Sequence, residues 1–300
     1  MRRVGVGRVV QLVQYVRTVM HVHAHMCPAG PGPRRLRATM ACACALVLCT
    51  VPALRAQDST RSPRDAQPER PTVATHAGTV ARGFLEIETG VERDRGPGDA
   101  RNVIGAFVAK MGLAPNMQLS VFTNASAPGN ASFGVGDVAL GVKWRLPEDH
   151  PWLGEFALLP TVKFATGSVD QGTGTGTTDV SLLLISSRDV GPVHIDLNAG
   201  WTHRTGNGEA APRDASVWTA SFGGAVSGPL GWTVEVYGYP GTRGPSGAPP
   251  IVAVLAGPTF VVQNTLVLDV GVVVPVQGGQ PHALYGGVTY NVGRLWGSGK

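Results

Sequence analysis

The chain contains no cysteine beyond Cys49, and only 15% of its 300 residues are charged, against about 25% in an average protein. Beyond that cysteine, serine and threonine are the remaining hydroxyl or thiol nucleophiles. The low charge excludes a coiled coil and a charge-rich disordered chain. Glycine, in contrast, is abundant, because its 41 residues are about twice the average share. The composition therefore predicts a folded, glycine-rich chain.

The excess of positive charge is confined to the beginning of the chain. The formal net charge is +5, but residues 1–56 hold eight arginines and no acidic residue. From residue 57 onward, 17 lysines and arginines are outnumbered by 20 acidic residues. That part of the chain offers no clustered basic surface for phosphates, and we expect no nucleic-acid partner.

Residues 1–56 have the pattern of an upstream extension that ends in a secretory signal peptide. Three arginines (Arg34, Arg35 and Arg37) precede an apolar run over residues 40–54, and Ala56 occupies a cleavage position. The run is shorter than the roughly 20 residues that a membrane-spanning helix needs. We expect export and removal of this leader by cleavage near Ala56. Three methionines are candidate translation starts: Met1, Met26 and Met40.

Three segments follow the leader. Residues 57–78 contain three prolines among polar residues and almost no large apolar side chain. Because such a segment cannot bury enough apolar surface to offset its ordering entropy, we expect a flexible N-terminal linker there. Residues 79–296 carry a strand pattern, and residues 297–300 form a short tail.

Apolar and polar residues alternate with a period of two from residue 80 onward. The clearest case is residues 193–201, where Leu197 belongs to the apolar set and Asn198 to the polar set. Successive side chains of a strand point to opposite faces, so these two residues mark one apolar and one polar face. Residues 85–91 and 138–144 alternate in the same way. The alternation is fainter over residues 156–164, 218–226, 232–239, 266–274 and 284–292.

About twelve such segments approach the roughly 9 to 11 residues of a tilted transmembrane strand. Short turns alternate with long loops between them. The turns cover residues 114–116, 187–189, 228–230 and 263–264, and the loops cover residues 93–101, 124–134, 167–177, 205–214 and 240–250. Short periplasmic turns and long outer loops are typical of bacterial outer-membrane barrels.

The pattern therefore predicts an all-β fold, a closed antiparallel transmembrane β-barrel of about 12 strands in the lipid of the bacterial outer membrane. A secreted β-sandwich is the alternative. A sandwich should expose many charged side chains on its second face, whereas here that face carries mostly Gly, Ala, Thr, Ser and Asn. Such a face suits the lumen of a barrel better.

Three stretches resemble the family of outer-membrane transporters named after the meta pathway of phenol degradation. They are residues 134–146 (GVGDVALGVKWRL), residues 159–168 (LPTVKFATGS) and the Gly-Thr-rich link into residues 178–182 (TDVSL). The resemblance spans residues 80–293. It implies an outer-membrane β-barrel that transports aromatic or other hydrophobic compounds, and it implies no catalytic residues.

The sequence shows no site for catalysis, a cofactor or a metal. The glycines of residues 134–136 and 172–176 do not lie between a strand and a helix, and no Gly-Lys-Ser/Thr follows them. His194 and Asp196 could form a polar pair for hydrolysis, but no marked serine lies beside them in the sequence. We therefore expect that the protein is not an enzyme, and a hydrolase embedded in the membrane is the weaker possibility.

Charged residues on the polar face are the remaining functional candidates. They could line a passage and select solutes, or they could pair across neighbouring strands and plug a narrow barrel. The candidates for lining the lumen are Glu86, Glu88, Lys143, Arg145, Lys163, His194, Asp196 and Glu235. The function that we expect is passive or facilitated passage of small, hydrophobic or aromatic solutes. The alternatives are a structural or adhesive barrel without transport and a secreted binding domain. The sequence leaves the oligomeric state open.

Overall fold

A computed structural model describes residues 62–95, 101–127, 133–146 and 149–297. The predicted signal peptide, its cleavage position at Ala56 and residues 298–300 of the predicted tail lie outside this part of the chain. Within the described residues, the structure has no helix of the length and apolarity needed to span a membrane.

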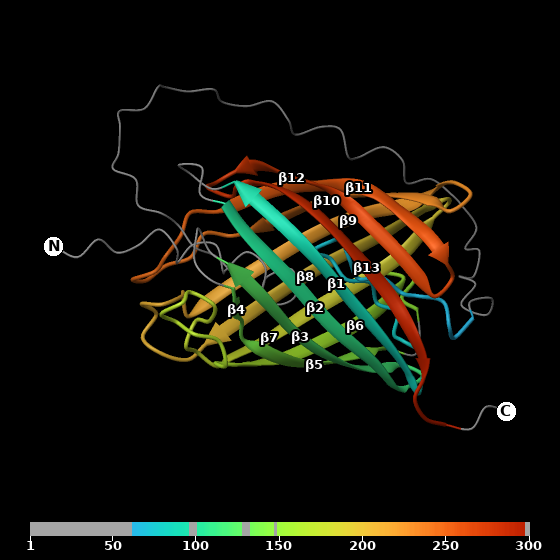
Figure 1. Ribbon diagram of the computed structural model, residues 1–300, viewed down its shortest axis with the longest axis horizontal. Helices are drawn as coiled ribbons and strands as arrows, with labels where there is room; N and C mark the ends of the chain where they lie inside the picture. The colour runs from blue at the N-terminus through green and yellow to red at the C-terminus, as the bar shows by residue number, and fades with distance from the viewer. Residues whose placement is uncertain (1–61, 96–100, 128–132, 147–148, 298–300) are drawn as a thin grey trace.

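The described chain forms one antiparallel sheet that closes on itself (Figure 1). Its strands are β1 (Phe84–Arg95), β2 (Arg101–Ala114), β3 (Met117–Ala127), β4 (Gly134–Val135), β5 (Val138–Arg145), β6 (Glu155–Phe164), β7 (Asp179–Val190), β8 (Val193–Arg204), β9 (Asp214–Ser227), β10 (Leu230–Tyr239), β11 (Ile251–Gln263), β12 (Leu266–Gln277) and β13 (His282–Arg294). The last strand pairs with the first, as in the register of Ile87 opposite Tyr290. The two-residue β4 and the following β5 pair with the same strand, β3, so the wall has twelve strands. The predicted closed barrel of about 12 strands is confirmed.

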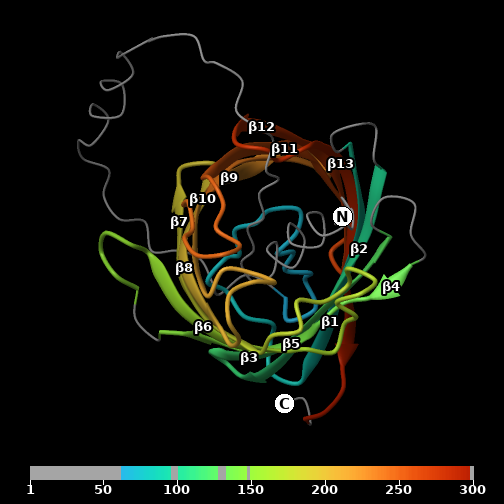
Figure 2. The ribbon, with the colours of Figure 1, turned by 90° about the vertical axis from the view of Figure 1, so that its left-hand side faces the viewer.

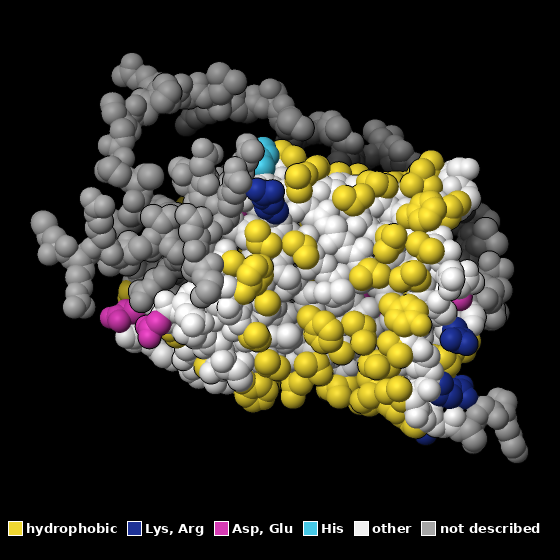
Figure 3. Space-filling view, in the orientation of Figure 1, with side chains coloured by type: hydrophobic (Ala, Val, Ile, Leu, Met, Phe, Trp, Pro, Cys, Tyr) yellow, Lys and Arg dark blue, Asp and Glu magenta, His cyan; other side chains and the backbone are white. Residues whose placement is uncertain are grey.

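The alternation along the strands separates an apolar outer face from an inner face. In β8, Leu197 points outward with 46% of its surface exposed, whereas Asn198 points inward with 4% exposed. The same alternation gives the outside of the barrel a belt of exposed hydrophobic side chains (Figure 3). Such a surface would cost free energy in water but is stable against lipid, so the barrel spans a membrane.

The two ends of the barrel differ in their connections. At the short-turn end, two-residue links join the strands at residues 115–116, 191–192, 228–229 and 264–265. At the long-loop end, longer links cover residues 165–178, 205–213 and 240–250. One turn differs from its predicted place, because β7 continues through residues 187–189 and the chain reverses at Gly191, whose φ of 59° suits glycine. Ser187 to Asp189 continue the ladder with β8, which the local sequence did not indicate.

Residues 62–83, which we call the lumen segment, lie inside the ring of strands (Figure 2). The backbone amide of Ala66 donates a hydrogen bond of 2.6 Å to the carbonyl oxygen of Asn264 at the short-turn end. The segment then reaches Glu235 in the middle of β10 and returns to Gln118 near the start of β3. It therefore forms a loop that enters and leaves the lumen at the short-turn end.

This placement differs from the flexible linker that the composition predicted for residues 57–78, of which residues 62–78 are described. The prediction considered only the apolar surface that the segment could bury. In the structure, polar side chains of the barrel wall bond its backbone instead, and these partners are far away in the sequence.

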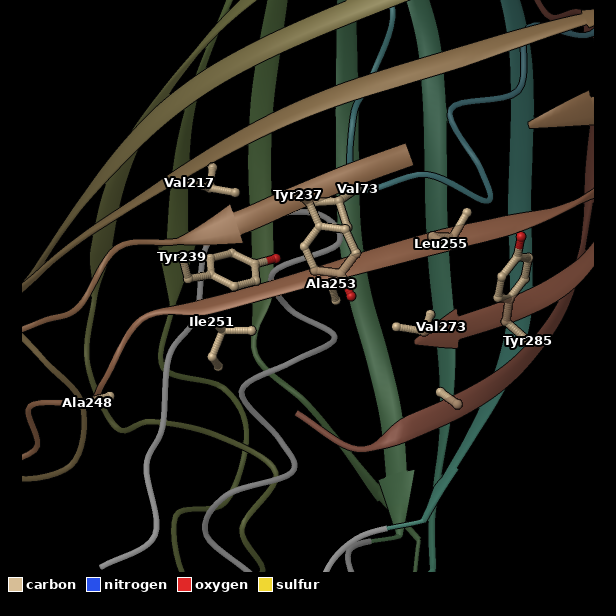
Figure 4. Close-up of a cluster of buried hydrophobic side chains, with 11 residues drawn as sticks. Val73, Val217, Tyr237, Tyr239, Ala248, Ile251, Ala253, Leu255, Val273 and Tyr285 are labelled. Atoms are coloured by element: carbon tan, nitrogen blue, oxygen red, sulfur yellow. The ribbon is translucent and has the colours of Figure 1, made fainter. Parts of the chain in front are cut away.

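The inner face also carries bulky apolar side chains that the alternation had not indicated. One cluster lies on strands β9 to β13 and includes Tyr237, Tyr239 and Tyr285, which point into the barrel (Figure 4). A second cluster lies on β2, β3 and β5 to β7 and includes Phe122 and Leu159. Each cluster includes one residue of the lumen segment, Val73 in the first and Ala77 in the second. The lumen is therefore both polar and apolar.

The assignment of faces can be tested in β8. Leu197→Arg places a charge on the lipid-facing side near the middle of the strand, and it should destabilise the barrel in bilayers by about 2 to 4 kcal/mol. Thr219→Val, on the inner face of β9 and directly opposite Asn198 in the ladder, keeps the shape of the side chain and should leave the barrel's folding free energy nearly unchanged. Equilibrium folding into lipid vesicles measures both values. Equal destabilisation by the two substitutions would contradict the assignment.

Candidate functional site

A cluster of buried charges lies inside the barrel near the short-turn end. Lys110 on β2 forms an ion pair with Glu86 of β1, at 2.6 Å, and a second one with Glu88 of the same strand. Lys143 on β5 forms an ion pair with Glu69 of the lumen segment. The two lysines have no exposed side-chain surface. Because an isolated buried charge costs several kcal/mol, these carboxylates offset the cost of burying the two lysines.

Glu69 is the member of this cluster that the lumen segment supplies. Its carboxylate accepts hydrogen bonds from Lys143 and, at 3.3 Å, from the amide nitrogen of Gln118. Burial alone would raise the pKa of this carboxyl group, but the ammonium groups of Lys143 and Lys110 hold the pKa well below its usual range. Glu69 is therefore ionised at neutral pH.

Lys143 also holds the part of the lumen segment that follows Glu69. Its ammonium donates to the carbonyl oxygens of His76, at 2.8 Å, and Gly78, at 3.0 Å. Burial and the nearby Lys143 lower the pKa of His76 to about 3, so the imidazole is neutral at neutral pH. One lysine thus bonds a carboxylate and two backbone carbonyls of the same segment.

The middle of the lumen segment is held by side chains of three other strands, β10, β8 and β7. Glu235 of β10 accepts hydrogen bonds from the backbone amides of Val73 and Ala74, both at 2.7 Å. Asn198 of β8 accepts from the amide of Thr75 at 2.7 Å and donates to its carbonyl at 2.9 Å. These side chains take the place of a neighbouring strand, because they satisfy backbone groups that would otherwise be buried without partners.

Ser187 of β7 continues this arrangement. Its hydroxyl accepts a hydrogen bond from the amide of Ala77 at 2.7 Å and donates to Asp196 at 2.5 Å. His194 bonds the same carboxylate at 3.1 Å. A nucleophilic serine needs the imidazole as its base, whereas here the serine bonds the carboxylate directly. In this geometry the hydroxyl of Ser187 supports the lumen segment.

Arg70 lies in a hollow of the wall that two glycines create. A Cβ atom at Gly90 or Gly287 would collide with the guanidinium group of Arg70, so the absence of side chains at these opposed positions makes room for it. Asp269 of β12 lies 3.7 Å from the guanidinium. The wall therefore matches the lumen segment in shape as well as in charge.

A second buried charge cluster lies toward the long-loop end. Lys163 of β6 forms ion pairs with Asp137, at 2.9 Å, and Asp179, at 3.0 Å. Asp179 also pairs with Arg204 of β8, at 3.3 Å. Asp137 accepts from the amide and hydroxyl of Thr175, so this cluster anchors the loop of residues 165–178 to the wall. The charged partners that the described part of the chain supplies here belong to the barrel and its loops.

All eight predicted residues point into the barrel, but they occupy three different environments. Glu86, Glu88 and Lys143 join the cluster at the short-turn end, Lys163 joins the second cluster, and Glu235 holds the middle of the lumen segment. The remaining three, Arg145, His194 and Asp196, lie nearer the rim of the short-turn end, where Arg145 lies 3.5 Å from Glu155. Their influence on passing solutes stays a prediction.

Several residues of these clusters were not predicted from the sequence. Glu69 and Arg70 belong to the segment predicted to be a flexible linker, so no periodicity could place them in the lumen. Lys110 lies two positions after the inward-facing Val108 on β2. It could have been found by extending the alternation along this strand. Asp137 lies between β4 and β5, where no strand register applies.

A small cavity of about 40 Å³ lies between the lumen segment and the wall. Residues 69–75 of the lumen segment form one side. The wall side consists of Glu88 and the apolar residues Ala106, Val108, Phe122, Leu159 and Leu183, and Glu88 is the ladder partner of Val108. The cavity therefore has the carboxylate of Glu69 on the side of the lumen segment and a mainly aromatic and aliphatic surface on the side of the wall.

Comparisons with known proteins agree with this architecture. A family model described as "Putative MetA-pathway of phenol degradation" matches residues 69–293. No protein with a curated description matches the chain. The fold is similar to the COG4313 outer membrane channel from Pseudomonas putida F1, with a TM-score of 0.58 and 10% identity over 72% of this chain and 97% of that one. It also resembles the NanC porin, with a TM-score of 0.49 and 9% identity over 69% of this chain and 98% of that one. The KdgM porin is similar with a TM-score of 0.46 and 12% identity over 68% of this chain and 98% of that one.

The attachment of the lumen segment can be tested at Glu235. Glu235→Leu removes the acceptor of two backbone amides, so hydrogen exchange at Val73 and Ala74 should become at least about tenfold faster. Exchange in the strands should not change. Mass spectrometry of the full chain in lipid nanodiscs measures this exchange. Glu155→Leu, which removes an inward glutamate facing Arg145 instead, is the matched control and should leave both amides protected. Unchanged exchange in Glu235→Leu would show that the segment is held by other contacts.

Proposed function

The chain belongs to the MetA-pathway phenol-degradation family, and we propose that it is an outer-membrane channel for small amphipathic or aromatic solutes. The observation that carries this proposal is the content of the lumen. The barrel is filled in part by residues 62–83, a segment separate from the strands and held mainly by polar contacts. Water that enters the lumen can take over the hydrogen bonds of the segment, whereas the ion pair of Glu69 with Lys143 needs a replacement counter-charge when the segment moves.

The lining of the lumen supports solutes that are both polar and apolar. Tyrosines and aliphatic side chains cover part of the inner face, and charged pairs lie toward both ends. A barrel of twelve strands is wider than the roughly eight-stranded barrels that side chains fill, and narrower than the 16- to 18-stranded porins with an aqueous channel. The passage therefore suits small molecules.

We place the barrel in the membrane with its short-turn end toward the periplasm and its long-loop end outside. This orientation follows the general layout of outer-membrane barrels. It puts both ends of the lumen segment on the periplasmic side. Export by a signal peptide cleaved near Ala56 fits this location. The contacts of Ser187, His194 and Asp196 support a protein without enzymatic activity.

A structural barrel without transport is the rival proposal, and the packed lumen favours it. Its buried ion pairs and the lumen segment could serve only to fill the interior. The two proposals differ in whether the segment must move for the protein to act.

A disulfide lock separates them. The amide of Ala77 bonds the hydroxyl of Ser187, which brings the two backbones close enough for Ala77→Cys and Ser187→Cys to form a disulfide bond. We expect the oxidised double variant to block uptake of phenol and benzoate into proteoliposomes, and reduction to restore it. The chain for this experiment has its four native cysteines replaced by serine.

The single variant Ala77→Cys is the matched control and should transport in both redox states. Uptake by the locked variant equal to that of the control would mean that solutes pass without movement of the segment. Absence of uptake and of conductance in every variant, including a folded and heat-modifiable wild type, would contradict the channel and favour the structural barrel.

A further inference from the structure

Lys143 differs from the other two buried lysines in the origin of its counter-charge. Lys110 and Lys163 are paired with carboxylates of the barrel itself, Glu86 and Glu88 for the first and Asp137 and Asp179 for the second. Among the described residues, the carboxylate paired with Lys143 comes from the lumen segment. If this segment moves away, Lys143 loses its counter-charge.

The place occupied by the Glu69 carboxylate is therefore a carboxylate-binding site in the wall. The ammonium of Lys143 and the amide of Gln118 donate to this carboxylate. Lys110 contributes its positive charge nearby. Lys143 and Gln118 have 0% and 1% of their surface exposed, so a carboxylate bound to them is shielded from water. Charge-assisted bonds in such a site are stronger than those between neutral groups.

The cavity described above adjoins this site, since Glu69 is one of its lining residues. The apolar side chains that line the cavity on the side of the barrel wall include Phe122, Leu159 and Leu183. Its present volume of about 40 Å³ is well below the ~150 Å³ that holds a benzene ring. A ring could therefore enter only after the Glu69 side chain has left.

We propose that the Glu69 position on Lys143 and Gln118 is a binding site for small organic carboxylates with an apolar body, such as arylcarboxylates, and that these anions open the channel by displacing Glu69. The carboxylate of the solute forms the ion pair with the ammonium of Lys143 in place of Glu69. The apolar body of the solute lies against Phe122 and Leu159. This inference rests on the proposed channel function and names its ligand class.

The same geometry couples binding to movement of the lumen segment. Lys143 holds Glu69 and also the carbonyl oxygens of His76 and Gly78. The ammonium also donates to the hydroxyl of Thr75, so an anion that reorients it weakens four contacts of the segment at once. A neutral solute of the same shape cannot replace Glu69, because it would leave the buried ammonium without a counter-charge.

Benzoate and benzyl alcohol are matched probes, because they share the aromatic ring and differ in charge. Calorimetric titration of the full chain in lipid nanodiscs should show binding of benzoate and no binding of benzyl alcohol. Glu69→Gln removes the competing carboxylate, and it should bind benzoate about tenfold more tightly than the wild type. Lys143→Met should lose benzoate binding. Glu155→Gln, a matched change of another inward glutamate, should leave the affinity unchanged.

Conductance in planar bilayers gives the second readout. Benzoate should raise the open fraction of the wild type, and Glu69→Gln should be open more often without it. Glu69 is not part of a strand, so this variant tests the proposal even if Lys143→Met fails to fold. Equal benzoate affinity in the wild type and Glu69→Gln, or equally tight binding of benzyl alcohol, would overturn the proposal.

The channel function and the carboxylate site can be contradicted separately. A channel that conducts but does not distinguish benzoate from benzyl alcohol in any variant retains the proposed function and overturns the carboxylate site. A protein that binds benzoate more tightly after Glu69→Gln but never conducts or transports retains the site and overturns the channel.

Discussion

A fully buried ammonium needs a counter-charge, and in this barrel the counter-charge of Lys143 is carried by a segment outside the wall. Removing one partner of a buried ion pair typically costs about 3 to 5 kcal/mol, so the pair with Glu69 ties residues 62–83 to the lumen. The other contacts follow from this position. Once Glu69 is placed, the backbone that follows it reaches Glu235 and Asn198, whose side chains satisfy its amides. The wall and the lumen segment are therefore joined in one network of polar contacts.

The distribution of polarity along the lumen has consequences for transport. The ion pairs described for the cluster at the long-loop end join residues of the barrel and its loops, so they can remain intact while the lumen segment moves. The two apolar clusters, the first with its tyrosines, offer surfaces to aromatic solutes inside the lumen. The charged contact that a carboxylate solute replaces is the pair of Lys143 with Glu69. In this way the arrangement of buried charges separates the fixed part of the interior from the movable part.

The sequence predicts the wall of this protein better than its contents. Strands such as β1 and β8 are visible because a lipid-facing residue such as Leu197 and an inward residue such as Asn198 must alternate when the two sides of a strand meet different surroundings. The alternation also placed Glu86, Lys143 and Glu235 correctly on the inner face. It could not place the lumen segment, since a bond such as that between Thr75 and Asn198 joins residues 123 positions apart and involves backbone on one side. Nor could composition show it, because the wall supplies most of the segment's polar partners.

The central claim is that residues 62–83 occupy the lumen of the folded protein at rest. It is tested most directly by the thiol reactivity of a single cysteine at Val73, which is 8% exposed, in a chain whose native cysteines are replaced by serine. With the protein in lipid vesicles, a membrane-impermeant maleimide should modify Val73→Cys far more slowly than a cysteine at the exposed Ser62. Equal and rapid modification at both positions would show that the segment lies free in water, and it would contradict the account.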